Sequence, residues 1–181
     1  MSAHDRTAEL ILEAASHVLA MRGEAGSMAE VASAAGVGRS TLYRHFPSRE
    51  ALLEELARVA LSEAGERLAE AKLESVPPLE ALARAIRTIV DVGDRYVVLL
   101  EDQVPIDPAV TEHTIVAPLR RALERGQAEG VIRSDIDAMS LLELLGGLIV
   151  VSIRLAAERK RGIEETASVI QRIFVEGAGT R

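Results

Sequence analysis

The sequence predicts an all-α protein with an N-terminal three-helix domain and a larger C-terminal helical bundle. Of the residues, 48% are hydrophobic but only 2% are aromatic, so aliphatic side chains and alanine must form the core. Apolar residues recur at helical spacing along most of the chain. Proline and glycine separate these segments, and no segment alternates convincingly as a strand. We expect about nine helices, with domains at residues 1–48 and 49–181.

The N-terminal domain opens with an amphipathic helix over residues 5–22. Two short helices joined by a glycine turn follow within residues 27–46. Ser27 and Glu30 have the spacing of a capping box, in which each side chain bonds the backbone N–H of the other residue. Gly36 stands where the turn needs a left-handed backbone. This arrangement predicts a helix-turn-helix.

The second helix of this pair concentrates side chains suited to DNA. Leu42 and Phe46 are expected to face the core, so the polar residues between them face outward. Arginine and short polar side chains on such a helix reach base edges and phosphates in the major groove. The predicted DNA contacts, which include the cap of the first helix and an arginine after the second, are Ser27, Arg39, Ser40, Thr41, Tyr43, Arg44, His45 and Arg49. The alternative is a helical hairpin with a solvated polar face, and spacing alone does not separate the two.

The C-terminal domain begins with a long helix over residues 49–73, for which Ser48 is the expected cap. Because apolar residues near its start belong with the first domain, we expect this helix to connect the two domains rigidly. A helix from Pro78 to about residue 101 follows. Pro118 is expected to begin or kink the next helix. The last two helices are expected over about 134–161 and 163–175.

The net charge of −7 argues at first against nucleic acid as a partner. The charge is unevenly divided, however. Residues 1–50 carry five basic and six acidic residues, whereas the remainder carries 16 and 22. Arg39, Arg44 and Arg49 lie together, after five of the six acidic residues of the first part. Because salt screens distant charges over about 10 Å, this local cluster keeps DNA open as a partner.

Several classes of protein are excluded or disfavoured. The chain has no cysteine, which excludes disulfides, cysteine nucleophiles and thiolate metal sites. The four histidines show no metal-ligand spacing, and no nucleophile–base set or pair of carboxylates stands out. We therefore expect no metal, no cofactor and no enzymatic activity. The N-terminus has no signal-peptide pattern, and the apolar stretch from Leu144 to Ile153 is expected to be too short to span a bilayer. These features predict a soluble cytoplasmic protein without a membrane partner.

Residues 36–53 read Gly-Val-Gly-Arg-Ser-Thr-Leu-Tyr-Arg-His-Phe-Pro-Ser-Arg-Glu-Ala-Leu-Leu. This segment closely resembles the tetracycline-repressor (TetR) family of bacterial transcriptional regulators. The resemblance extends over about residues 7–56, and beyond them only the length and the helical plan match. It implies a recognition helix at about residues 39–45. The sequence departs from the family pattern at Arg49, where a lysine is usual, and at Gly38, where a serine commonly caps the helix.

The resemblance also implies a homodimer whose N-terminal domains bind a DNA operator and whose C-terminal domains bind a small effector. The interpretation is a ligand-responsive repressor on a pseudo-palindromic operator. An alternative is a helical small-molecule-binding or adaptor protein that has lost DNA binding. The candidate ligand contacts are Tyr96, Gln103 and His113, although a solvated surface position is the competing interpretation of His113.

A dimer interface is predicted on the last two helices. Apolar residues recur there at helical spacing, and a glycine pair would permit close approach of a second helix. This pattern fits a four-helix interface between two protomers, which the resemblance also implies. The predicted interface residues are Leu142, Leu145, Gly146, Ile149, Ile153, Ile170 and Ile173. The alternative is an ordinary core within one chain.

Overall fold

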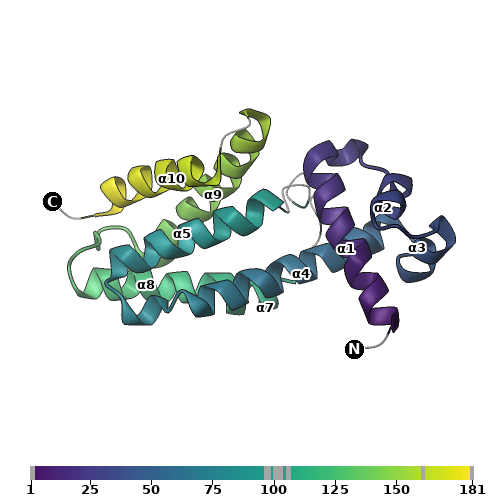
Figure 1. The fold of residues 1–181 in the computed structure, drawn as a ribbon. Coiled ribbons are helices and arrows are strands. Elements are labelled where there is room, and N and C mark those ends of the chain that lie inside the picture. Colours follow the sequence, from purple (N-terminus) through teal and green to yellow (C-terminus); the bar gives the residue numbers. More distant parts are fainter. Residues whose placement is uncertain (1–2, 96–98, 100–103, 105–106, 160–161, 180–181) are drawn as a thin grey trace. The chain divides into compact units, whose positions relative to one another are not determined.

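The computed structural model describes residues 3–95, 99, 104, 107–159 and 162–179 (Figure 1). Helices dominate these residues, and their only β-type pairing is an isolated bridge between Ile132 and Gly179. The prediction of an all-α protein is therefore confirmed, and the number of helices is close to nine. The chain forms two compact units, one of Met1–Ala60 with Arg95–Ile106 and one of Leu61–Asp94 with Asp107–Arg181.

The first unit is a small helical domain around one hydrophobic core. Its elements are α1 (Ala3–Arg22), η1 (Gly23–Ala25), α2 (Met28–Ala34), α3 (Arg39–His45) and the beginning of α4 (Arg49–Glu70). Helix α1 packs on α2, and α2 packs on α3. The core includes the fully buried Ile11, Leu19, Leu42, Leu52 and Leu56. Leu99 and Val104 join this core from the segment after α5.

Helix α4 belongs to both units. Its first turns bury Leu52, Leu53 and Leu56 in the core of the first unit, because these residues recur on one side of the helix. The compact units therefore divide between Ala60 and Leu61, within the helix. We had placed the domain boundary at residue 48, before the helix begins.

The second unit is a larger helical bundle. Its elements beyond α4 are η2 (Leu73–Ser75), α5 (Pro78–Arg95), α7 (Pro108–Thr111), η3 (Glu112–Val116), α8 (Ala117–Ala128), α9 (Ala138–Arg159) and α10 (Ile163–Ala178). Helix α5 runs back along α4, where Arg67 pairs with Asp91 and Arg84 donates to the Ala71 carbonyl. Helix α9 packs on both α8 and α10.

Side-chain caps explain where several helices begin. Ser48 accepts a hydrogen bond from the Ala51 N–H at 3.2 Å, as expected for the cap of α4. Asp137 accepts one from the Ser140 hydroxyl at 2.6 Å and one from the Ser140 N–H at 3.0 Å. The hydroxyl bond, followed by the backbone bond, lowers the pKa of the Asp137 carboxyl. Helix α9 therefore begins at Ala138, a few residues later than the sequence suggested.

The residues before Pro118 form a π-helical turn, η3. Proline has no backbone N–H, so Pro118 cannot donate the hydrogen bond that a regular α-helix would place on Thr114. A wider turn at this point also moves the Thr114 carbonyl away from the proline ring, which would clash with it in a regular α-helix. The expected disturbance at Pro118 is confirmed, and it presents His113 and Thr114 from an irregular part of the helix.

Candidate nucleic-acid interface and ligand cavity

Helix α2 begins with a complete capping box. The Ser27 hydroxyl accepts the Glu30 N–H at 3.3 Å, while the Ser27 N–H and hydroxyl both donate to Glu30 Oε2 at 2.9 Å. The backbone N–H of Ser27, followed by its hydroxyl, lowers the pKa of Glu30. Both donors of Ser27 are thus given to a carboxylate, so Ser27 caps α2, and its contact with a phosphate stays a prediction.

The turn between α2 and α3 has the backbone that the sequence indicated. Gly36 has a φ of 66°, in the left-handed region that favours glycine. Gly38 is the cap residue of α3, with a φ of −70° and no side chain to bond the helix. A short turn that contains a left-handed glycine is typical of a helix-turn-helix.

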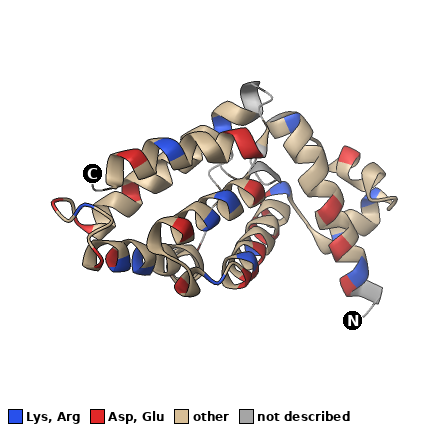
Figure 2. Ribbon diagram, turned by 60° about the vertical axis from the view of Figure 1, so that its left-hand side comes forward, with Lys and Arg blue, Asp and Glu red and all other residues tan. Residues whose placement is uncertain are grey.

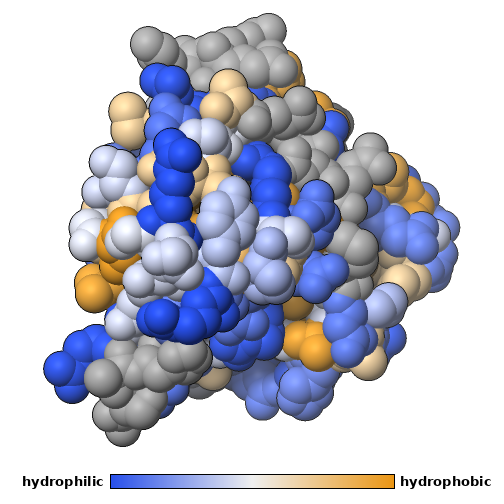
Figure 3. Space-filling view, turned by 90° about the vertical axis from the view of Figure 1, so that its right-hand side faces the viewer, coloured by the Kyte–Doolittle hydropathy of each residue, from blue (hydrophilic) through white to orange (hydrophobic). Residues whose placement is uncertain are grey.

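Helix α3 separates its apolar and polar residues cleanly. Leu42 is fully buried and Phe46 nearly so, as predicted. Arg39, Ser40, Tyr43 and Arg44 are exposed, whereas Thr41 and His45 are half-buried. Hydrophilic side chains gather on the side of the molecule seen in Figure 3, which looks toward α2 and α3. The structure therefore brings four of the predicted DNA contacts to one open helical surface.

Arg49 has an internal partner. Its Nη1 donates to the Gly26 carbonyl at 2.5 Å, which ties the start of α4 to the residue preceding the cap of α2. The sequence suggested only a phosphate contact, because nothing in the local pattern indicates a bond across 23 residues. A guanidinium has five N–H donors, so the bond to Gly26 does not by itself prevent a contact with a phosphate.

Helix α3 differs in charge from the other helices. It carries Arg39 and Arg44 and no acidic residue. In Figure 2, acidic and basic positions are mixed along most of the chain. Several of them form surface pairs, such as Arg58 with Glu55 and Arg120 with Glu112. Such pairs cancel much of each other's field, so the acidity of the whole chain does not oppose an anion at α3.

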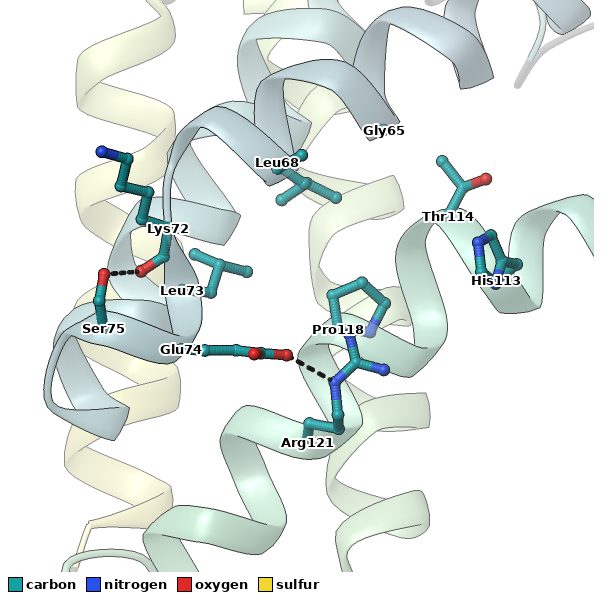
Figure 4. A pocket seen from close by; sticks show the side chains of 11 residues that line it. Gly65, Leu68, Lys72, Leu73, Glu74, Ser75, His113, Thr114, Pro118 and Arg121 are labelled. Carbon is teal, nitrogen blue, oxygen red and sulfur yellow. Dashed lines mark hydrogen bonds and ion pairs between the residues drawn. The ribbon is translucent and has the colours of Figure 1, made fainter.

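The second unit contains a cavity of about 650 Å³ between the end of α4 and the start of α8 (Figure 4). Its lining residues come from α4, η2, η3 and α8: Gly65, Leu68, Ala69, Lys72, Leu73, Glu74, Ser75, His113, Thr114, Pro118 and Arg121. Leucine and proline side chains form much of the wall, and Arg121 Nε lies 3.1 Å from Glu74 Oε1. Its size and mixed lining are those of a small-molecule site.

Of the predicted ligand contacts, His113 lines this cavity. Tyr96 and Gln103 lie outside the described residues. The remaining lining residues were not predicted, because they come from four separate segments and share no spacing in the sequence. Within the described part of the chain, no group of three or more potential metal ligands comes together.

The family model described as bacterial regulatory proteins, tetR family, matches residues 11–56. These residues run from the middle of α1 through α2 and α3 to the first turns of α4. The chain is 35% identical over 127 residues to the transcriptional repressor LfrR of Mycolicibacterium smegmatis, covering 66% of this chain and 67% of that protein. The chain belongs to the TetR family. It is thus a DNA-binding transcriptional regulator, and its relatives are regulators rather than enzymes.

One further relative and a solved structure of LfrR extend the similarity to the second unit. The repressor KstR2 of Rhodococcus jostii is 29% identical, over 80% of this chain and 76% of that protein. The solved structure of LfrR with proflavine has a TM-score of 0.73 and 26% identity, covering 97% of this chain and 99% of that chain. The TetR fold therefore includes the helical bundle of the second unit.

The predicted dimer residues divide into a buried and an exposed group in the single chain. Leu142, Leu145, Ile149, Ile153 and Ile170 are buried within a single TetR chain, so they belong to its own core. Gly146 and Ile173, the other two, are exposed. Apolar residues also lie open on the other side of the same helices: Met139, Leu144, Val151 and Leu155 on α9, and Val169 on α10. Leu144, Gly147, Val151 and Leu155 follow one side of α9, and Val169 and Ile173 follow one side of α10; we call these six residues the α9–α10 face.

Helix α9 is also more apolar than the sequence prediction allowed. Its segment Ala138–Ala156 is long and apolar enough to cross a membrane by length and composition, and 33% of that segment is buried inside the chain. The expectation that the apolar part of this helix is too short to span a bilayer considered only the stretch from Leu144 to Ile153. Core helices of soluble proteins pass the same test, so the exposed part of α9 needs its own explanation.

Proposed function

We propose that this TetR-family chain is a cytoplasmic repressor that binds a pseudo-palindromic operator as a homodimer and responds to a small ligand in its second unit. The observation that supports DNA binding most directly is α3, with Leu42 and Phe46 buried while Arg39 and Arg44 stand exposed. An exposed helix of this kind fits the major groove, and a dimer would place two of them about 34–36 Å apart.

The experiment is a binding titration with the DNA upstream of the gene for this protein. Arg44→Ala is expected to weaken binding about tenfold or more, because a charged hydrogen bond to DNA is lost. Arg58→Ala is the matched control, since Arg58 is an exposed arginine paired with Glu55 on α4. Repeating the titration at several salt concentrations should give a steep dependence, with a smaller slope for the α3 variant if Arg44 contacts a phosphate. Unchanged affinity of the α3 variant would contradict this placement of the recognition helix.

The same titration separates the regulator from a helical binding protein that has lost DNA binding. A regulator gives salt-dependent binding that prefers the upstream DNA over unrelated DNA of the same length. A protein that has lost the function gives weak binding to both. Of the two departures from the family pattern, Arg49 keeps the positive charge of the usual lysine, which favours the regulator.

We further propose that the α9–α10 face joins two protomers. Its α9 residues Leu144, Val151 and Leu155 are spaced by seven and four residues, so they form one stripe on the helix. Val169 and Ile173 form a second stripe on α10, the helix packed beside it. An added Cβ on Gly147, three residues after Leu144, meets nothing within 4 Å in the single chain, which leaves room for a partner helix.

The oligomeric state measured by light scattering tests this interface. Leu144, 64% exposed, becomes buried in the proposed dimer, so Leu144→Glu should yield monomers. Met21→Glu is the matched control, because Met21 is equally apolar and 72% exposed but lies on α1. A dimer that survives Leu144→Glu would refute the interface. Recovery of the wild-type protein on phosphatidylcholine vesicles instead of as a dimer would assign α9 to a membrane.

A further inference from the structure

The cavity of Figure 4 is crossed at one end by a solvent-exposed ion pair. Arg121 Nε lies 3.1 Å from Glu74 Oε1, and the two side chains are 55% and 77% exposed. Exposed pairs of this kind hold weakly, because water and salt screen both charges. Arg121 uses one of its five donors in this bond, and the guanidinium points past Pro118 toward the cavity. The arginine is therefore able to exchange Glu74 for another carboxylate.

A second hollow of about 310 Å³ lies against the same pair. It is lined by Arg121 and Glu74, with Leu73 and Pro118 shared with the larger cavity and Arg125 added. The two hollows thus meet at the ion pair. The larger one offers apolar walls, among them Leu68, and the smaller one offers a second guanidinium.

Arg125 makes the surroundings of the pair more positive. Its guanidinium donates to the carbonyls of Leu73, Glu74 and Val76 at 2.6–3.0 Å. Its Nε makes no hydrogen bond among the described residues, and the carboxylate paired with it, Glu129, is 3.9 Å away. A buried N–H donor of this kind gains from a closer acceptor.

Basic residues outnumber acidic ones in the lining of the two hollows. Lys72 and Arg121 line the larger cavity and Arg125 lines the smaller one, against the single carboxylate of Glu74. In Figure 4 the Lys72 amine points away from the cavity, so the two arginines are the groups that a bound head group would meet. Guanidinium groups bind carboxylates in a bidentate manner, which a cationic ligand could not use.

We propose that the two hollows form one site for an amphipathic carboxylate, whose apolar body lies against Leu68, Leu73 and Pro118. Its carboxylate replaces Glu74 as the partner of Arg121, with Arg125 beside it. This inference rests on the proposed ligand response of the second unit and names the chemical class of the ligand. It differs from the cation proflavine, which the LfrR structure contains.

The test uses two probes with the same apolar body and opposite charge, decanoate and decyltrimethylammonium, below their micelle concentrations in calorimetric titrations. Wild-type protein should bind decanoate more tightly than the cation. Arg121→Gln should weaken decanoate binding about tenfold or more. Glu74→Gln, a change of nearly equal shape at the other end of the same pair, should strengthen decanoate binding because the competing carboxylate is gone.

The opposite responses of the two variants distinguish this site from unspecific binding to the exposed α9–α10 face. Both changed side chains are exposed, so both variants are expected to fold, which the thermal midpoint checks. Tighter binding of the cation, or decanoate affinity unchanged in both variants, would overturn the proposal. Because the probes are measured without DNA, that failure is separate from a failure of operator binding.

Discussion

Single residues in the helix-turn-helix support a sharp prediction about two neighbouring glycines. Gly36 has a φ of 66° and Gly38 a φ of −70°, and an added Cβ would meet no atom closer than 3.9 Å at either position. The two positions therefore differ in backbone conformation and not in the space around them. Gly36→Ala should lower the free energy of unfolding by about 1–2 kcal/mol. Gly38→Ser should raise it by a few tenths of a kcal/mol, because serine caps α3. Urea denaturation measures both, and equal effects would contradict the backbone argument.

The capping box makes the stability of the first unit depend on pH. Hydrogen bonds from Ser27 lower the pKa of Glu30 in the folded state. The stabilisation is therefore complete above the unfolded pKa and is lost as the pH falls through the folded value. Wild-type protein should exceed Glu30→Ala in unfolding free energy at pH 7, and the difference should shrink in acid. The other carboxylates are common to both proteins, so a difference that stays constant with pH would refute the role of Glu30.

The residues of the helix-turn-helix were predictable because their signals are local. Ser27 and Glu30 are three residues apart, and Gly36 marks its own backbone conformation. Arg49 shows where such reasoning ends. Its bond to the Gly26 carbonyl joins residues that only the folded core of the first unit brings together. The sequence therefore predicted its charge but not its internal partner.

Among whole elements, the packing of α5 against α9 gives a prediction about a pair of residues. A Cβ on Gly93 would lie 2.4 Å from Cδ1 of Ile153, which is 3% exposed. Gly93→Ala therefore forces the isoleucine to move, although alanine favours the helix. Ile153→Val removes the clashing methyl group at a cost of about 0.5–1.5 kcal/mol.

The double variant should be more stable than the sum of the two single changes allows, by a coupling of roughly 0.5–3 kcal/mol. Chemical denaturation of all four proteins measures this coupling. Gly147→Ala combined with Ile153→Val is the control, since a Cβ on Gly147 meets nothing within 4 Å in the chain. Additive effects for the pair at Gly93 would show that the two helices do not approach as described.

Helix α9 shows why periodicity in the sequence did not separate its buried side from its exposed side. Periodicity identifies the buried side of a helix only when the other side is polar. In α9, Leu145 and Ile149 are buried while Leu144 and Val151 are exposed, so apolar residues occur on both sides. The cavity was unpredictable for a different reason: the disturbance at Pro118 was visible, but its approach to the end of α4 is a tertiary contact.

At the scale of the whole molecule, α4 contributes several turns to each of the two units. Its first turns form part of the core beneath the helix-turn-helix, and Leu68 near its end lines the cavity. A ligand that favours one position of the end of α4 therefore has a covalent, helical route to the DNA-binding unit. Such coupling requires different ligand affinities in the two states of the protein.

This coupling must be reciprocal, which gives a quantitative prediction. If saturating decanoate weakens operator binding by a given factor, saturating operator DNA must weaken decanoate binding by the same factor, and typical factors are about 5–150. Both can be measured by calorimetry and by fluorescence anisotropy of labelled DNA. Arg44→Ala should require about tenfold more DNA for the same effect while retaining decanoate affinity without DNA, because Arg44 lies on α3 and not at the cavity. Unequal factors would show that decanoate acts on DNA binding by a process other than occupation of a coupled site.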